Sequence, residues 1–191
     1  MCGIAGFYKP NEMNSSQAEN VITLMTDALI HRGPDDSNTF SSPMGNFFLG
    51  HRRLAIVDTS KGGLQPMKSQ SGNLVISFNG EIYNHLDLRI ELEEESQSLS
   101  WSSSSDTETL LAAFEQWGVE KTLPKIRGMF AIALWDESKK DLYLIRDRFG
   151  EKPLYYGWIE GEESSVFGFA SELKALRKFP NFSNKVSKEA L

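Results

Sequence analysis

The chain opens on the stretch MCGIAGF, residues 1–7, in which its single cysteine, Cys2, follows the initiator methionine. The small Cys2 side chain leaves the preceding bond open to a peptidase, and loss of Met1 would place a thiol and a free α-amine on one residue. An α-amine has an ordinary pKa of about 7.7–8.0, so near neutral pH much of it can act as a base. A thiolate formed beside a base is a strong nucleophile. A lone cysteine can equally be a small buried hydrophobic residue, and position alone leaves both interpretations open.

The composition sets broad limits on fold and function. The 191 residues, 40% of them hydrophobic, can bury the core of one domain. A net charge of -6 and a pI near 5.2 give no overall basic field, so we expect no nucleic-acid partner. One cysteine excludes an internal disulfide, and neither a secretory signal nor a bilayer-long apolar run is evident. We therefore expect a cytoplasmic protein with no membrane partner.

Hydrophobic patterning divides the chain into short strands and a few helices. Strands are expected at 2–8, 46–49, 54–57, 74–78, 130–135, 141–146, 154–158 and 166–170. Helices are expected from a Ser15-Ser16 cap to His31, at 84–94 and at 107–117, with a mobile serine-rich loop at 96–105. Antiparallel strand pairs with inserted helices predict an α+β fold in which two sheets pack face to face under helices. We assign residues 1–178 to this domain and 179–191 to a polar tail or the start of a linker.

Asn79, Gly80 and Glu81 follow directly after the expected strand 74–78. A side-chain amide and an unshielded backbone N–H that lie this close together can form an oxyanion hole. The Asn-Gly pair is also the strongest short signal for a hairpin turn, and taken alone it favours the turn.

Two charged residues suggest a site for an amino acid. Arg53 stands at the start of an apolar run and could clamp a carboxylate with two hydrogen bonds, although most arginines are solvated surface charges. Asp106 could bind an ammonium group, but a residue at the head of a helix is ordinarily an N-cap. Each signal is weak when it is considered alone.

A series of short motifs runs in order along nearly the whole chain. They are MCGIAG (1–6), HRGPD (31–35), HRRLAIVD (51–58), NGEIYN (79–84), SDTE (105–108), RGMFA (127–131), RDRFGEKPLYY (146–156) and ASELKAL (170–176). As a set these motifs resemble the class II glutamine amidotransferase domain of the asparagine synthetase type. The resemblance implies an N-terminal-nucleophile hydrolase fold with layers αββα and a glutaminase that releases ammonia.

The resemblance also implies a role for individual residues. Cys2 would attack the side-chain amide of L-glutamine while its own α-amine relays the proton. Asn79 and the Gly80 N–H would hold the oxyanion. Arg53 matches the residue that grips the substrate α-carboxylate, and Glu81 and Asp106 match the positions that receive the α-ammonium. Backbone groups of a short segment would line the site: Leu54, Ala55, Ile56 and Val57. No metal site and no cofactor are expected within this chain.

Family members differ in how they use the ammonia. Segments 81–85 and 149–156 resemble asparagine synthetase and its relatives in surface-polysaccharide amidation more than glucosamine-phosphate synthases or amidophosphoribosyltransferases. In asparagine synthetase and its polysaccharide-amidating relatives, a C-terminal ATP-pyrophosphatase domain activates the acceptor carboxylate with ATP and magnesium. We therefore expect a synthetase domain or subunit as partner, with ATP and magnesium bound there, and a homodimer is one assembly left open.

Two local departures and one different class of function complete the expectations. Asn38 stands where the family commonly has glycine, and Asn tolerates a left-handed backbone better than most residues. Residues 102–105 replace a stretch that often contains glycine. A non-catalytic module that binds glutamine or a partner is the alternative, because fold does not fix activity. The joint presence of the nucleophile and its expected binding residues argues against that alternative.

Overall fold

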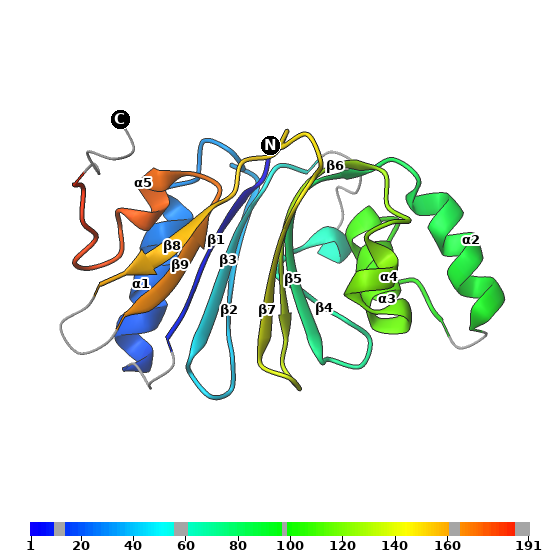
Figure 1. The fold of residues 1–191 in the computed structure, drawn as a ribbon, viewed down its shortest axis with the longest axis horizontal. Helices are drawn as coiled ribbons and strands as arrows, with labels where there is room; N and C mark the ends of the chain where they lie inside the picture. The colour runs from blue at the N-terminus through cyan, green and yellow to red at the C-terminus, as the bar shows by residue number, and fades with distance from the viewer. Residues whose placement is uncertain (10–13, 56–60, 97–98, 161–164, 186–191) are drawn as a thin grey trace.

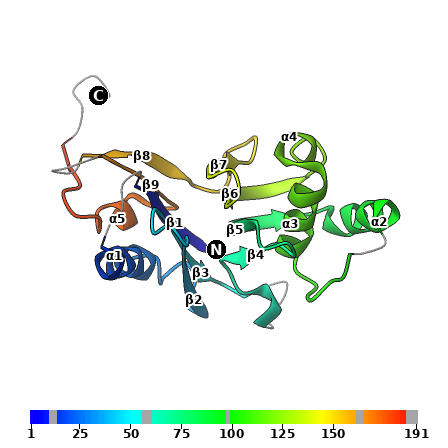
Figure 2. The same cartoon turned by 90° about the horizontal axis from the view of Figure 1, so that it is seen from below.

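Two antiparallel sheets lie face to face between two layers of helices in the computed structural model (Figures 1 and 2), which describes residues 1–9, 14–55, 61–96, 99–160 and 165–185. The first sheet has the order β2-β3-β1-β9-β8 and contains β1 (Gly3–Tyr8), β2 (Asp36–Ser41), β3 (Phe47–Arg53), β8 (Tyr155–Ile159) and β9 (Val166–Ala170). The second has the order β4-β5-β6-β7 and contains β4 (Met67–Lys68), β5 (Leu74–Ile82), β6 (Gly128–Asp136) and β7 (Asp141–Arg146). The predicted α+β fold with αββα layers is confirmed.

The helices divide between the outer faces of the sheets. Helix α1 (Ser15–Asp27) and the short α5 (Leu173–Leu176) pack on the first sheet, and α2 (His85–Glu95), α3 (Asp106–Trp117) and α4 (Val119–Thr122) lie beside the second (Figure 1). A short 3-10 helix, η1, spans Lys61–Gly63. No described helix has the length and hydropathy of a membrane-spanning segment.

The core between the two sheets is built from large side chains on their facing sides. Phe47 of β3 stacks on Trp135 of β6 with ring centroids 4.3 Å apart, and both residues are fully buried. Offset-stacked aromatic pairs of this kind add about 0.5–1.5 kcal/mol beyond the burial of their area. This contact joins the sheets and therefore sets how the ends of β1 and β5 face each other.

The N-cap of helix α1 lies one residue before the Ser15-Ser16 cap that the sequence suggests. The Asn14 side chain accepts from Ser16 N at 3.1 Å and from Gln17 N, so it caps the helix in place of the serines. The helix buries Ile22 and Met25 against the first sheet, which contains β1, the strand that follows Cys2.

Strand β5 continues past the end predicted for it. Asn79 and Gly80 pair with Ala131 and Phe130 in the middle of the ladder with β6, so the hairpin-turn interpretation of Asn-Gly is wrong. A Cβ on Gly80 would lie 2.2 Å from the Met129 carbonyl oxygen, and the glycine is needed for this close approach of two strands.

Strand β3 ends where a new strand was expected to begin. Arg53 is the last residue of β3, and Leu54 and Ala55 lie outside any strand, which corrects the predicted strand 54–57. Its second half, Ile56 and Val57, lies outside the described residues. The alternative that Arg53 is a solvated surface charge is wrong, because the side chain is buried.

The residue that caps α3 differs from the one that the sequence suggests. Ser105 is the N-cap, with its hydroxyl accepting from Thr107 N, and Asp106 is the first helical residue. The Asp106 carboxylate instead accepts from Ile82 N at 2.9 Å, across to the end of β5. The interpretation of Asp106 as an N-cap is therefore wrong, and its side chain is available to the space between α3 and β5.

Phe179, the first residue of the predicted tail, is buried and packs edge-on against Phe7.

Candidate active site

A cavity of about 200 Å³ opens where the ends of β1, β3 and β5 meet the start of α3. Its walls contain every predicted site residue that the structure describes: Cys2, Arg53, Leu54, Ala55, Asn79, Gly80, Glu81 and Asp106. Ile56 and Val57 lie outside the described residues. Side chains separated by more than a hundred positions thus converge because the two sheets pack face to face.

The Cys2 thiol lies against the segment that follows β3. Its Sγ is 3.4 Å from Leu54 N, which donates to it, and 3.8 Å from the Leu54 carbonyl oxygen. Burial raises the pKa of the thiol above its ordinary value, against the lowering effects of the Leu54 N–H and of the positive charges of the chain terminus, Arg53 and Arg32. The thiol is therefore protonated near neutral pH, and the site needs a base.

The three histidines lie away from the Cys2 thiol. His51 donates from Nε2 to the Phe78 carbonyl oxygen at 3.1 Å, and burial lowers its pKa to about 4, so the imidazole is neutral near neutral pH. No hydrogen bond between described residues joins His31, His51 or His85 to Cys2, and none of these three lines the cavity. Met1 is attached here, so the Cys2 nitrogen is an amide, and removal of Met1 would create the amine that sequence analysis predicts as base.

Asn79 presents an amide to the cavity from the second sheet. The residue is 1% exposed, and among the described residues its Nδ2 has no hydrogen-bond partner. An unsatisfied buried donor costs about 1–3 kcal/mol, so its retention needs a reason. A ligand atom that accepts from Nδ2 within the cavity would supply one.

The Gly80 N–H points to the edge of β5 that faces Gln65 and Asp106. Phe78 N donates to the Gln65 side chain at 2.6 Å, and Ile82 N donates to Asp106 at 2.9 Å. Successive N–H groups of a strand alternate between its edges, so the N–H of Gly80 points the same way as those two. Gly80 lines the cavity, and its N–H and the Asn79 amide together can stabilise an oxyanion.

Charged groups of both signs stand around the cavity. Arg53 is 5% exposed, and its Nη1 lies 3.2 Å from Asp36 Oδ2. Asp106 is 6% exposed, and burial raises the pKa of its carboxyl despite the hydrogen bond from Ile82 N. Glu81 is exposed at the rim. A ligand with a carboxylate and an ammonium group matches these charges. In the described part of the chain no three His, Cys, Asp or Glu side chains gather as a metal ion requires.

The serine-rich loop before α3 is fastened to α2 and α3 rather than loose where it is described. Arg89 Nη2 donates to the carbonyl oxygens of Ser103 and Ser105, each at 3.0 Å, and its guanidinium lies 4.2 Å from the Trp101 ring. Glu108 accepts from the backbone N–H groups of Ser102 and Ser103 and from the Ser103 hydroxyl. These bonds fix the approach of the chain to Asp106.

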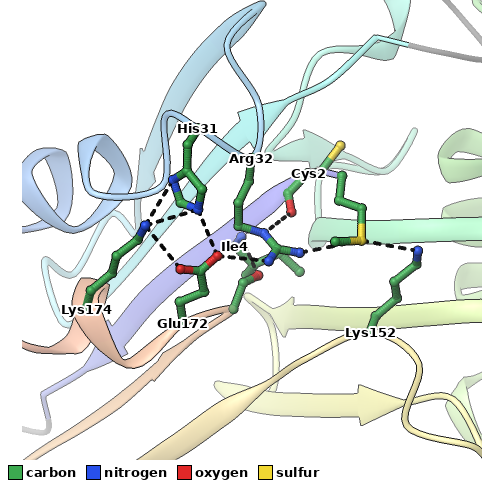
Figure 3. A network of polar contacts seen from close by, with 9 residues as sticks. Cys2, Ile4, His31, Arg32, Lys152, Glu172 and Lys174 are labelled. Atoms are coloured by element: carbon green, nitrogen blue, oxygen red, sulfur yellow. Dashed lines mark hydrogen bonds and ion pairs between the residues drawn. The ribbon is translucent and has the colours of Figure 1, made fainter.

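A polar network holds the segment that carries Cys2 (Figure 3). Arg32 donates from Nε to the Cys2 carbonyl oxygen and from Nη1 to Glu172, both at 2.9 Å. Figure 3 shows the Cys2 carbonyl directed at this guanidinium and the thiol directed away from it. Arg32, Glu172 and Lys152 had no role predicted from the sequence. The signal available was that each of them lies within a motif that carries the resemblance.

Comparisons with known proteins agree with this geometry. A sequence profile described as "Glutamine amidotransferase domain" matches residues 1–191. Asparagine synthetase [glutamine-hydrolyzing] 1 of Bacillus subtilis is 40% identical over 192 residues, which are 100% of this chain and 29% of that protein. Asparagine synthetase B [glutamine-hydrolyzing] of Escherichia coli is 40% identical over 177 residues, 92% of this chain and 30% of that protein. The chain thus spans less than a third of the length of these relatives.

A solved structure supports the fold. The glutamine phosphoribosylpyrophosphate amidotransferase of B. subtilis, complexed with ADP and GMP, has a TM-score of 0.75 at 22% identity, covering 92% of this chain and 43% of that one. The fold of this solved structure and the whole-chain profile match define a glutamine amidotransferase domain. Because the profile covers the whole chain, the protein belongs to the glutamine amidotransferase domain family, and it is an enzyme domain of that type. The family resemblance inferred from the motifs is confirmed.

Proposed function

We propose that this chain, once Met1 is removed, hydrolyses L-glutamine with Cys2 as nucleophile and supplies the ammonia to an ATP-dependent amidation. The observation that carries the proposal is the buried Asn79 Nδ2, which has no hydrogen-bond partner among the described residues; Asn79 lines the same cavity as Cys2 but comes from the opposite sheet. Such a donor is matched to an oxygen that becomes negatively charged during a reaction.

The first half of the reaction forms a thioester. The α-amine of Cys2 takes the thiol proton, and the sulfur attacks the side-chain amide carbon of glutamine. The C–S bond forms, and the carbonyl oxygen becomes an oxyanion that Asn79 Nδ2 and the Gly80 N–H stabilise. The protonated amine then gives its proton to the leaving nitrogen, the C–N bond breaks, and ammonia departs.

The second half releases glutamate. The α-amine, neutral again, takes a proton from water as that water attacks the thioester carbon. The same two donors hold the second oxyanion, and its collapse breaks the C–S bond and returns the proton to the sulfur. Glutamate leaves and Cys2 is regenerated, so this half-reaction requires no cofactor.

Recognition of free glutamine follows from the charges around the cavity. Arg53 would grip the α-carboxylate beside the backbone at Leu54 and Ala55, with Ile56 and Val57 continuing that wall. Asp106 and Glu81 would receive the α-ammonium. A glutamine residue inside a protein has neither charge, so the site would select the free amino acid.

The acceptor of the ammonia is the finer part of the proposal. The curated relatives named above are glutamine-hydrolysing asparagine synthetases, and they support aspartate as the acceptor, with a sugar acid as the alternative. We propose a synthetase domain or subunit as partner, with ATP and magnesium bound there and with the reaction in the cytoplasm.

Replacement of the nucleophile tests the proposal. Ammonia and glutamate release from glutamine is measured on the chain with a free Cys2 terminus and on Cys2→Ala. The variant should lose essentially all turnover while its circular dichroism spectrum and melting temperature stay close to those of the parent. Turnover of the variant within about tenfold of the parent would exclude Cys2 as the nucleophile.

A further inference from the structure

Lys152 places an ammonium group in the wall of the cavity. The residue is 8% exposed, and its Nζ lies 3.7 Å from the Met1 Sδ. Among the described residues no ion pair includes Lys152, and a thioether sulfur is only a weak acceptor. Lysine is rarely buried without a paired charge, so this arrangement needs a functional explanation.

The loop that carries Lys152 is rigidly held. The Asp147 carboxylate accepts four backbone N–H groups, including that of Lys152 at 3.1 Å. Arg146 Nε donates to the Lys152 carbonyl oxygen at 2.7 Å. Burial opposes ionisation of Asp147, but these N–H groups lower the pKa of its carboxyl, so it is charged near neutral pH. Lys152 therefore projects from a fixed backbone position.

Met1 separates two cations at the point where the mature chain would begin. Its sulfur lies 3.7 Å from Lys152 Nζ and 4.0 Å from Arg32 Nη2. Only a few bonds join that sulfur to the nitrogen of Cys2. Removal of Met1 therefore opens the space between the new α-amine and these cations.

The charges around the terminus are not equally compensated. Arg32 is paired with Glu172 at 2.9 Å, and Arg53 is paired with Asp36 at 3.2 Å. Asp106 and Glu81 also line the cavity, and Asp106 is hydrogen-bonded to the end of β5. Lys174 and His31 contact Glu172 on the side away from Cys2 (Figure 3). Among these groups Lys152 is the cation without a carboxylate of its own.

We propose that Lys152 is a positioning residue of electrostatic kind, whose ammonium group keeps the mature α-amine of Cys2 unprotonated near neutral pH. A nearby positive charge disfavours the protonated amine and so lowers its pKa. The inference rests on the proposed function, because it assigns the amine the role of general base. It does not make Lys152 a contact of the substrate.

The single cysteine of the chain allows a direct measurement. Chain labelled with [15N]cysteine and cleaved to begin at Cys2 has one labelled α-nitrogen, whose NMR shift reports its protonation from pH 5 to 10. We expect the amine pKa of Lys152→Met to rise by about half to one unit. Lys152→Arg should stay within about a quarter of a unit of the parent, because it keeps the charge.

Glutaminase kinetics provide the second readout. In Lys152→Met the acid limb of kcat/KM should move to higher pH by the same amount as the amine pKa, with rates near pH 9 unchanged. Lys68→Met removes the same charge outside the cavity and should leave both the amine pKa and the limb unchanged. Lys152→Gln, a second neutral variant, guards against misfolding of the first.

The outcomes separate this inference from the proposed function. An amine pKa that is the same in the parent, Lys152→Met and Lys152→Gln would overturn the inference. A raised amine pKa in chains that all fail to hydrolyse glutamine would support the electrostatic role of Lys152 and reject the glutaminase.

Discussion

Arg32 donates from Nε to the carbonyl oxygen of Cys2 at 2.9 Å, and this bond ties the proposed nucleophile to the turn after α1. The guanidinium is held in turn by Glu172 at 2.9 Å, just beyond the end of β9. Ser171 strengthens the same junction, since its hydroxyl accepts from Ile4 N and its own N–H donates to the Ile4 carbonyl oxygen. The start of β1 is thus fixed from two directions.

Loss of the Glu172 charge should lower turnover without weakening glutamine binding. In Glu172→Gln the ion pair to Arg32 is lost, so the guanidinium holds the Cys2 carbonyl less firmly, while no residue of the cavity wall changes. We expect kcat to fall about five- to twelvefold, as for loss of about 1–1.5 kcal/mol of hydrogen bonding, with KM within about twofold. Glu120→Gln, on exposed α4, is the matched control and should behave as the parent. A rise in KM with unchanged kcat would contradict this role.

The same residue should contribute to acid stability. Burial opposes ionisation of Glu172, but Arg32, His31 and Lys174 lower its pKa to about 2 from an ordinary 4.5. A lowered carboxyl pKa in the folded state stabilises the fold above the ordinary value, and this contribution is lost as the pH falls from about 4.5 to about 2. The free energy of unfolding of the parent, measured with urea, should decrease as the pH falls through that window. Glu172→Gln should show a shallower decline there, and identical pH slopes would count against the ion pair.

Removal of the Asn79 amide should affect the transition state. Asn79→Ala is expected to reduce kcat by about 10²–10³, since loss of one oxyanion donor costs about 3–4 kcal/mol, while KM changes little. Steady-state kinetics and melting temperature are measured together. Ser77→Ala alters a buried polar residue two positions earlier on β5 and should leave turnover close to that of the parent. If Asn79→Ala lowers stability but retains full turnover, the amide is structural.

The Asp106 carboxylate should lower the stability of the fold but strengthen glutamine binding. Burial raises the pKa of its carboxyl, so ionisation above the ordinary value of 3.8 costs folding free energy, and Asp106→Asn removes that cost. The variant should melt at the same or a higher temperature at neutral pH and bind glutamine at least tenfold more weakly, because a charged hydrogen bond contributes about 1.5–3 kcal/mol. Ser105→Ala removes the actual N-cap and should instead cost about 1 kcal/mol of stability. Unchanged glutamine affinity in Asp106→Asn would remove it from the binding site.

The base should be the α-amine and not a histidine. A chain that keeps one residue before Cys2 has an amide nitrogen there, so it should fold but not hydrolyse glutamine, and trimming to Cys2 should restore activity. Single replacements of His31, His51 and His85 should each leave measurable turnover. Equal rates before and after trimming, or one folded histidine variant with no activity, would reject the amine as base.

Much of the fold could be predicted from local patterns. Short continuous apolar runs located β6 and β7, and helical spacing located α1 and α3, because such patterns reflect which faces of an element are buried. The predictions from the sequence were wrong where a local turn signal competes with strand pairing between distant segments. Asn79-Gly80 has the sequence of a turn, yet pairing with Ala131 and Phe130 and the close approach at Met129 keep it within β5.

The sequence by itself determined the family and predicted the nucleophile and the binding residues, because those depend on residue type and order along the chain. Only the tertiary structure decided that Arg53 is buried, that Ser105 rather than Asp106 caps α3, and that Lys152 and Arg32 flank the terminus. Burial, partner choice and electrostatic environment arise from contacts between elements far apart in sequence. No local pattern records these contacts, since they exist only once the two sheets have packed together.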